Sequence, residues 1–188
     1  MDQPAVRSDL LKARLLFAAA MLVALVAGWL FGAGGLERLV RNTTSTTSST
    51  ADVGQPAPQF SLASAAGPDV RLADYRGQVV LVNFWATWCE PCRTEMPAID
   101  RVYRQQQGRG FEVLAVDVEE GAGQVQTYQA ELGLSFPALL DADGTVSRSY
   151  RARGLPTSFL VDRQGTIRFV KVGALDEDTL TQQLDKLL

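Results

Sequence analysis

The sequence contains no histidine and only two cysteines among its 188 residues. The lack of histidine excludes Ser-His-Asp triads, Cys-His nucleophilic sites and histidine metal ligands. Two cysteines are also too few for a structural zinc site, which usually takes four soft ligands. The formal net charge of −3 provides no basic field for nucleic acid. We therefore expect neither a metal site nor a nucleic-acid partner.

The two cysteines lie three residues apart, in Trp88-Cys89-Glu90-Pro91-Cys92. A Cys-x-x-Cys between an apolar run and a helical pattern indicates a thioredoxin-like redox site. An inert structural disulfide is a weaker interpretation, because a bridge over so few residues constrains the unfolded chain very little. Cys89 precedes the first helical turn, where free amides and the helix dipole stabilise a thiolate, so we expect it to be the exposed nucleophile. Cys92 falls on the inward face and is the expected resolving thiol.

The N-terminal part of the chain predicts a membrane anchor. Residues 15–36 carry no charge, and about 20 such residues cross a bilayer as a helix. Flanking basic residues weakly favour a cytoplasmic location for residues 1–14. A cleaved signal peptide is the alternative, although its apolar region is normally shorter. Residues 37–52, rich in Thr and Ser, are expected to be a flexible linker that holds a domain at 53–188 outside the cytoplasm.

From residue 53 onward the pattern predicts strands that alternate with helices. The expected strands are 60–62 and 70–72, joined as a hairpin through Gly67-Pro68, then 79–85, 111–118, 136–140, 157–161 and 166–172. The expected helices are 91–107, 124–132, 146–150 and one that begins near Asp176. Strand–helix–strand units followed by a hairpin and a helix imply a mixed α/β sheet covered by helices. Pro97 lies inside the first long helix and should kink it.

Several segments of the chain resemble a known family. Residues 84–92, Phe-Trp-Ala-Thr-Trp-Cys-Glu-Pro-Cys, are similar to the thioredoxin superfamily motif, and residues 54–62, 72–77 and 154–160 match further pieces. Together they resemble the membrane-anchored thiol–disulfide oxidoreductases of the ResA/TlpA type, in the AhpC/TSA-redoxin superfamily. The resemblance implies a thioredoxin-like α/β fold with an N-terminal β-hairpin and a strand–helix insertion between Phe111 and Leu140, preceded by one transmembrane helix.

The resemblance also implies the composition of the site. A cis peptide bond is implied before Pro156, which would face the two cysteines and bind the substrate backbone by strand addition. No bound cofactor is implied. The residues expected to bind substrate or shape the site are Trp88, Glu90, Pro91, Leu155, Pro156 and Thr157.

A buried acid is expected one turn after the cysteines. Thioredoxins usually carry a buried aspartate where this chain has Asn83, which cannot take up a proton. Glu95 lies three residues after Cys92, on the same helical face, and the ResA-like proteins carry a glutamate there. We hypothesise that burial raises the pKa of Glu95 and that it donates or accepts the proton during exchange. The alternative is an exposed glutamate paired with a neighbouring arginine.

The direction of electron flow follows from the sign of these charges. Glu90 and Glu95 place negative charge near the sulfurs, which raises thiol pKa values and favours the disulfide, so we expect a reductant of protein disulfides. If Glu90 points into water, screening would leave the potential unchanged. The resemblance implies a membrane electron donor of the CcdA/DsbD type and apocytochrome c as a frequent substrate.

Two other functions are compatible with a two-cysteine site. A thiol peroxidase would share the fold, but peroxidatic sites usually have a proline shortly before the cysteine, and residues 79–88, which include Phe84, contain none. A Cu(I) chaperone could use the two thiolates, since soft Cu(I) accepts such ligands, but no Met-rich stretch accompanies them.

Overall fold

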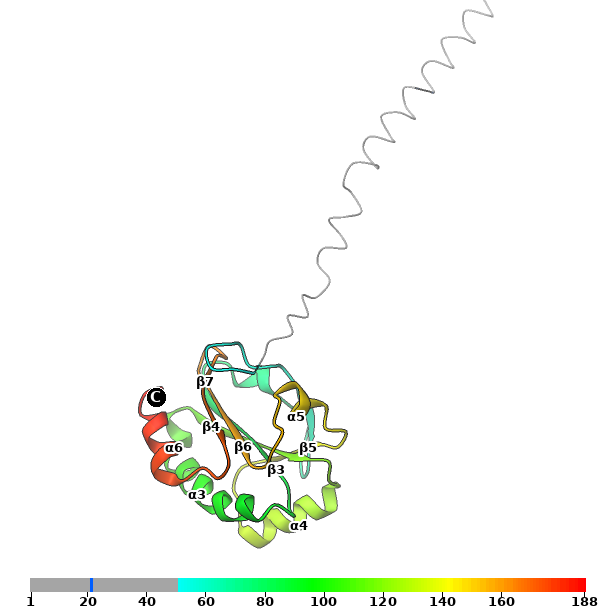
Figure 1. The fold of residues 1–188 in the computed structure, drawn as a ribbon, viewed down its shortest axis with the longest axis vertical. Helices are drawn as coiled ribbons and strands as arrows, with labels where there is room; N and C mark the ends of the chain where they lie inside the picture. Colours follow the sequence, from blue (N-terminus) through cyan, green and yellow to red (C-terminus); the bar gives the residue numbers. More distant parts are fainter. Residues whose placement is uncertain (1–20, 22–50) are drawn as a thin grey trace, which may run out of the picture. The chain divides into compact units, whose positions relative to one another are not determined.

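The computed structural model describes Met21 and residues 51–188. Residues 51–188 form a seven-stranded sheet with helices on both faces (Figure 1). Its elements, in chain order, are β1 (Ser61–Ser64), β2 (Val70–Arg71), the 3-10 helix η1 (Leu72–Tyr75), β3 (Val79–Trp85), α3 (Glu90–Gln106), the 3-10 helix η2 (Gln107–Arg109), β4 (Phe111–Val118), α4 (Ala122–Leu132), β5 (Ala138–Asp141), α5 (Thr145–Ser149), β6 (Thr157–Val161), β7 (Ile167–Val172) and α6 (Glu177–Leu184).

The sheet is mixed, as the sequence predicts. The strand order is β2-β1-β5-β4-β3-β6-β7. β3, β4 and β5 run parallel in the centre, and the outer strands pair antiparallel. The expected N-terminal hairpin is confirmed by the pairing of β1 with β2, in which Leu62 lies opposite Val70. β4, α4 and β5 lie in the region of the expected insertion.

Strand β3 runs through the middle of the core and leads to the cysteines. All seven of its residues are buried. Val79, Leu81 and Trp85 belong to the cluster that includes apolar residues of α3, α4 and α6. Val80 and Phe84 belong to the cluster on the opposite face, which includes Val146 of α5. Because helices cover both faces (Figure 1), the strand reads as a nearly continuous apolar run.

The predicted helices form, with small shifts of their ends. α3 begins at Glu90, one residue before the predicted start, because Cys89 is its N-cap. The helix is continuous to Gln106 although Pro97 lies inside it; the kink at Pro97 stays a prediction. α4 begins two residues earlier than expected, after the N-cap Gly121, and ends before Gly133, which has a left-handed backbone conformation suited to glycine.

The predicted N-terminal segments lie outside the described residues. These are the cytoplasmic stretch 1–14, the anchor 15–36 and the linker 37–52, of which the structure describes only Met21, Ala51 and Asp52. In the described part of the chain, no helix is long and apolar enough to cross a membrane.

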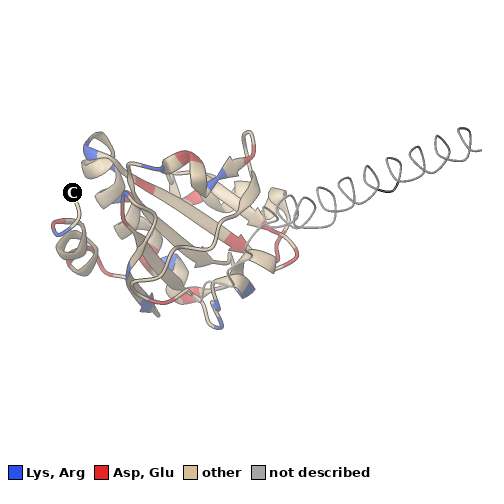
Figure 2. Ribbon diagram, turned by 90° about the horizontal axis from the view of Figure 1, so that it is seen from above, with Lys and Arg blue, Asp and Glu red and all other residues tan. Residues whose placement is uncertain are grey.

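In the view of Figure 2, acidic and basic segments intermingle over the domain, and they do not separate into two faces.

Candidate active site

Cys89 and Cys92 form a disulfide at the start of α3. The S–S distance is 2.02 Å and the two Cα atoms lie 5.2 Å apart. Cys89 is the N-cap residue, and its sulfur accepts a hydrogen bond from the backbone N–H of Cys92 at 3.3 Å. Pro91 fits the first turn, because the amide that it lacks has no helical partner there. The sulfur of Cys89 thus lies where free amides and the helix dipole stabilise a thiolate.

The two cysteines differ in exposure less than the sequence predicts. Cys92 is completely buried, but Cys89 is only 5% exposed, so the prediction of an exposed nucleophile holds only in the relative sense. The disulfide draws the Cys89 side chain toward buried Cys92 and its helix amide, which explains the low exposure. The surface of this loop is formed by Trp88, which is 70% exposed, and by exposed Glu90.

Glu95 is a buried acid one helical turn after Cys92. The side chain is 2% exposed. Its Oε2 accepts the backbone N–H of Leu175 at 2.6 Å, and its Oε1 accepts Nδ2 of Asn83 at 2.8 Å. Burial raises the pKa of Glu95 to about 7, and the two hydrogen bonds oppose only part of that rise. Glu95 is therefore not an exposed carboxylate paired with an arginine.

Asn83 allows the surroundings of Glu95 to suit either protonation state. Its Nδ2 donates both to Glu95 and to Oγ of Ser158, at 2.9 Å, while its buried Oδ1 has no donor among the described residues. A half-turn of this amide would let Oδ1 accept a hydrogen bond from a protonated Glu95. The Ser158 hydroxyl can serve as donor or acceptor in either arrangement. Glu95 can therefore keep a hydrogen bond to Asn83 whether or not it carries a proton.

The peptide bond between Leu155 and Pro156 is cis, as the family resemblance implies. β6 begins at the next residue, Thr157, which lies opposite Phe84 of β3. Pro156 is thus at the sheet edge where β3 ends and the cysteine loop begins. Within residues 51–188, neither the N–H nor the C=O of Leu155 has a hydrogen-bond partner. This backbone is available to an extended peptide.

A second pair of acids beside the cysteine loop was missed by the sequence reasoning. The Glu120 carboxylate accepts both the backbone N–H and the hydroxyl of Thr87, each at 2.6 Å. Asp117, near the end of β4, is completely buried. Burial raises the pKa of Asp117 to about 8, and the neighbouring Glu120 carboxyl adds to the rise. Their position in the sequence, at and just after the end of β4, could have indicated the pair. β3 and β4 are parallel, so their carboxyl ends lie at the same end of the sheet, beside the cysteine loop.

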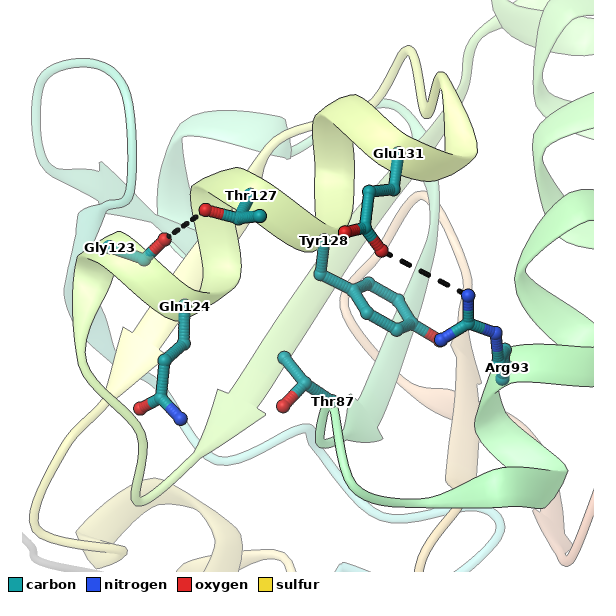
Figure 3. A pocket seen from close by; sticks show the side chains of 7 residues that line it. All are labelled: Thr87, Arg93, Gly123, Gln124, Thr127, Tyr128 and Glu131. Carbon is teal, nitrogen blue, oxygen red and sulfur yellow. Dashed lines mark hydrogen bonds and ion pairs between the residues drawn. The ribbon is translucent and has the colours of Figure 1, made fainter.

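An open pocket lies between the cysteine loop and α4 (Figure 3). Arg93 of α3 contacts two of the α4 side chains that line it. Its guanidinium lies 5.5 Å from the ring centroid of Tyr128 and 3.9 Å from Oε2 of Glu131. The complete lining consists of Thr87, Arg93, Gly123, Gln124, Thr127, Tyr128 and Glu131. The pocket shares Thr87 with the acid pair and so adjoins the redox site.

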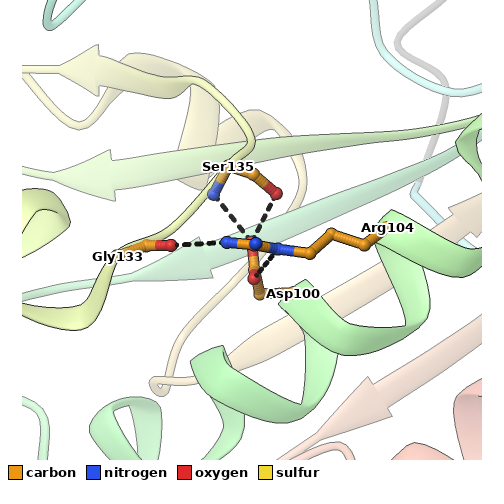
Figure 4. Close-up of polar contacts among 4 residues, drawn as sticks. All are labelled: Asp100, Arg104, Gly133 and Ser135. Carbon is orange, nitrogen blue, oxygen red and sulfur yellow. Dashed lines mark hydrogen bonds and ion pairs between the residues drawn. The ribbon is translucent and has the colours of Figure 1, made fainter.

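A third buried acid, Asp100, supports the site from the far part of α3 (Figure 4). Its Oδ1 accepts the N–H of Ser135 at 2.7 Å and the Ser135 hydroxyl at 2.6 Å, and its Oδ2 accepts Nε of Arg104 at 2.6 Å. Arg104 also donates to the carbonyl of Gly133 at 2.8 Å. Although burial acts to raise it, these donors lower the pKa of Asp100. The network ties α3 to the segment after α4.

Comparison with known proteins assigns the family. Residues 53–170 match the AhpC/TSA family. The chain is 38% identical to the thiol-disulfide oxidoreductase ResA of Geobacillus thermodenitrificans over 135 residues, which are 72% of this chain and 78% of that protein. It is 36% identical to ResA of Bacillus subtilis over 127 residues, 68% of this chain and 71% of that one.

Solved structures agree with this assignment. A putative thiol:disulfide interchange protein DsbE from Chlorobium tepidum superposes with a TM-score of 0.68 and 35% identity. The match covers 72% of this chain and 96% of that one. The chain belongs to the AhpC/TSA family and is a thiol–disulfide oxidoreductase of the ResA/DsbE type with a thioredoxin-like fold.

Proposed function

We propose that this oxidoreductase reduces disulfide bonds of substrate proteins outside the cytoplasm. The observation that carries the proposal is the arrangement of the cysteine pair at the start of α3: Cys89 is the N-cap, Cys92 is completely buried, and the buried acid Glu95 follows one turn later. Cys89 is the attacking thiol, Cys92 is the resolving thiol and Glu95 is the proton carrier.

The proposed reaction has two exchange steps. The Cys89 thiolate attacks one sulfur of a substrate disulfide, so that a mixed disulfide forms and one substrate thiolate leaves. Cys92 then loses its proton and attacks the sulfur of Cys89. The Cys89–Cys92 disulfide forms and the second substrate thiolate leaves. The enzyme dithiol is oxidised by two electrons, the substrate disulfide is reduced, and the two enzyme thiol protons end on the two substrate thiols.

Glu95 is proposed as the proton carrier for Cys92. Its pKa of about 7 lies near neutral pH, where a group can both take up and release a proton. Its position three residues after Cys92 keeps it on the same helical face. The hydrogen bonds from Leu175 and Asn83 hold the carboxyl group in place during the transfer.

Negative charge near the sulfurs supports the reducing direction. Glu90 is exposed, so water and salt screen its charge and it contributes little. Glu95, and Glu120, which binds the loop through Thr87, supply the remaining negative charge. None of the ion pairs within residues 51–188 involves either carboxylate. Uncompensated negative charge disfavours the thiolates and so favours the oxidised enzyme.

The cellular setting rests on the sequence and on family resemblance. Residues 15–36 are proposed as a membrane anchor, with the catalytic domain on the outer side. Apocytochrome c, before haem attachment, is the proposed substrate, and a membrane protein of the CcdA/DsbD type is the proposed electron donor. The backbone of Leu155, which has no hydrogen-bond partner in the part of the chain that the structure describes, lies beside cis Pro156 and supports binding of the substrate as an extended strand.

Trapping tests the proposed function in the full-length protein. Cys92→Ala should accumulate mixed disulfides on Cys89 with proteins from the cell envelope, because the resolving thiol is missing. Cys89→Ala is the matched control and should trap none. Identification of the trapped proteins names the substrate, and thiol reductant should release them. Equal recovery with both variants, or no mixed disulfide with either, would contradict the proposal, as would a reduction potential near that of the strong oxidant DsbA, about −120 mV.

The thiol peroxidase and the Cu(I) chaperone have less support from the site than the disulfide reductase. The buried strand that leads to Cys89 contains no proline of a peroxidatic motif. Peroxidatic sites also use an arginine to activate the cysteine, but Arg93 contacts Tyr128 and Glu131. Hydrogen peroxide consumption by the purified protein would favour a thiol peroxidase. Stoichiometric Cu(I) binding that depends on both cysteines would favour a copper chaperone.

A further inference from the structure

We propose that Asp117 and Glu120 share one proton and together act as positioning residues that hold the loop presenting Cys89. The inference deepens the proposed function and rests on it for the role of the loop in exchange. It assigns to this acid pair a part separate from that of Glu95, which lies on α3 and contacts Asn83 and Leu175.

The contact between Glu120 and Thr87 fixes the cysteine loop. Thr87 lies between β3 and α3, two residues before Cys89. Glu120 accepts both of its donors at 2.6 Å, so the carboxylate grips backbone and side chain together. Hydrogen bonds to an ionised acceptor are the stronger kind. The next backbone bond along the loop, from Cys89 N–H to the carbonyl of Ala86, continues the same turn. Displacement of Glu120 would therefore move the segment that carries Cys89.

Asp117 is completely buried, and the Glu120 carboxyl is the charged neighbour that raises its pKa most. Asp117 lies opposite Trp85 in the β3–β4 ladder and opposite Leu140 in the β4–β5 ladder. Both of its carboxyl oxygens are buried and make no hydrogen bond of normal geometry with the described residues, and the nearby backbone N–H of Glu120 lowers the pKa of Asp117 only in part. An ionised carboxylate in that position would be costly. A protonated Asp117 can instead donate its O–H to Glu120, which then keeps its charge for Thr87.

The backbone between the two acids adopts a strained conformation. Glu119 has a φ of +65°, a left-handed conformation that non-glycine residues rarely adopt. Its N–H donates to the carbonyl of Asp141 at 3.1 Å, which holds the turn against β5. The strain turns the chain sharply after β4, so that Glu120 reaches Thr87 and stays near Asp117. Such strain persists only where the surrounding structure imposes it, and it gathers at functional sites.

The other charged groups around the pair are mostly acidic, so they favour retention of the shared proton. Glu119 lies between the two acids in the chain. Asp141 on β5 acts on Asp117 directly and raises its pKa further. Tyr128 of α4 packs on Trp85 with ring centroids 5.1 Å apart. The groups that act on this tyrosine are Arg93, Glu90, Glu131 and Glu120, of which Arg93 is the one cation.

Loss of the shared proton should loosen the loop. With one proton, the pair carries a single negative charge, and Thr87 donates two hydrogen bonds to the ionised Glu120. Above the Asp117 pKa of about 8, the buried Asp117 carboxylate and the half-buried Glu120 carboxylate would repel each other, and Glu120 would be pushed from its place. The position of Cys89, and with it the rate of attack on a disulfide, would then change with pH independently of Glu95.

Nuclear magnetic resonance of the oxidised full chain in detergent micelles tests the pair, because the cysteines do not titrate in that form. The Thr87 amide proton should be shifted downfield and should follow a one-proton titration near pH 8. Asp117→Asn should abolish the titration and keep the downfield shift. Glu120→Gln should lose the downfield shift. Asp69→Asn, which removes an exposed acid of the β1–β2 turn, should behave as the wild type.

Two outcomes would overturn the inference. One is a Thr87 amide that does not respond to pH in the wild type; the other is a titration near pH 8 that persists in Asp117→Asn. If Asp117→Asn does not fold, loss of the same titration in Glu120→Gln supports the pair, and its persistence contradicts it. Glu95→Gln should retain the Thr87 titration, and its loss in this variant would also count against the inference. A wild-type enzyme that passes this test but reduces no disulfide would contradict the proposed function alone.

A matching kinetic measurement separates a positioning role from a purely structural one. The pH profile of disulfide reduction by the wild type should contain an inflection near pH 8 that is missing in Asp117→Asn, while the inflection near pH 7 from Glu95 stays. Thr87→Ser keeps both donors to Glu120 and should keep the wild-type profile. Identical profiles for Asp117→Asn and the wild type would contradict the positioning role.

Discussion

The acid sites on the two sides of the cysteine loop are both buried, yet they are built differently. Glu95 receives two hydrogen bonds, from the backbone of Leu175 and the amide of Asn83. Asp117 receives none from the described residues and faces a second carboxyl group, Glu120. The first site can exist with or without a proton, whereas the second needs a proton to avoid an unpaired buried charge. Burial alone therefore does not define the behaviour of an acid, since its donors and neighbouring charges decide it.

Asp100 is a third buried acid, but its pKa shifts in the opposite direction. It is nearly as buried as Glu95, but three donors and the charge of Arg104 keep the carboxylate ionised and lower its pKa. The order of pKa values, lowest at Asp100 and highest at Asp117, follows the number of donors and the sign of the nearest charge. Asp100 has a structural part in the fold, and the two acids with raised pKa values adjoin the chemistry.

The largest effect is expected from Asp117→Asn on the pH dependence of stability. Its pKa rises from an ordinary 3.8 to about 8 in the folded state. The wild type therefore loses stability as the pH rises between these values, because the unfolded chain ionises first. Asparagine does not titrate. As the pH rises from about 4 to 9, the free energy of unfolding of the variant, measured in urea, should increase by several kcal/mol relative to that of the wild type. If the free energy of unfolding depended on pH in the same way for both proteins, the proposed difference between the two acid sites would be contradicted.

A smaller effect is expected from Glu95→Gln. Raising the pKa from 4.5 to about 7 corresponds to about 3 kcal/mol, lost from the wild type as the pH rises through that window. After a half-turn of the Asn83 side-chain amide, its Oδ1, which has no donor within residues 51–188, can accept a hydrogen bond from the new amide, so the variant should fold. Its rate of disulfide exchange should fall and lose its inflection near pH 7. Unchanged cysteine pKa values and an unchanged exchange rate would refute the role of Glu95 as proton carrier.

Asp100→Ala is expected to have the smallest effect on the free energy of unfolding, and at neutral pH it should lower the stability where the other two variants raise it. The substitution leaves the Ser135 amide and Arg104 without their acceptor, which should cost about 2 kcal/mol at neutral pH. Because the pKa of Asp100 is lowered on folding, its contribution is present above the ordinary value and disappears as the pH falls. Asp100→Asn keeps one acceptor and should lose less. Chemical unfolding at neutral and acidic pH measures both, and a cost that grows on acidification would contradict this account.

Much of the domain could be predicted from local patterns. The run at residues 79–85 indicated a strand covered on both faces, and all of its residues are buried. The Cys-x-x-Cys and its proline indicated a helix start, and Cys89 is the N-cap. The buried Glu95 followed from helical spacing. These features depend on residues close in sequence, where periodicity and capping act directly.

Features that depend on which strands are neighbours did not follow from local patterns. Glu120 reaches Thr87 across 33 residues of chain, and only the parallel pairing of β3 with β4 brings them to one sheet edge. The donor to Glu95 from Leu175 comes from 80 residues away. The low exposure of Cys89 was likewise missed, because it depends on the disulfide and on the packing of the loop.

The sequence by itself determined the redox chemistry, because the number, spacing and setting of two cysteines leave few other reactions in a chain without histidine. It also determined the order of strands and helices, since apolar periodicity acts over short distances. Only the tertiary structure decided which carboxyl groups surround the sulfurs and which of them have donors. Desolvation, distant hydrogen-bond donors and neighbouring charges set a pKa, and these depend on which strands lie side by side in the sheet.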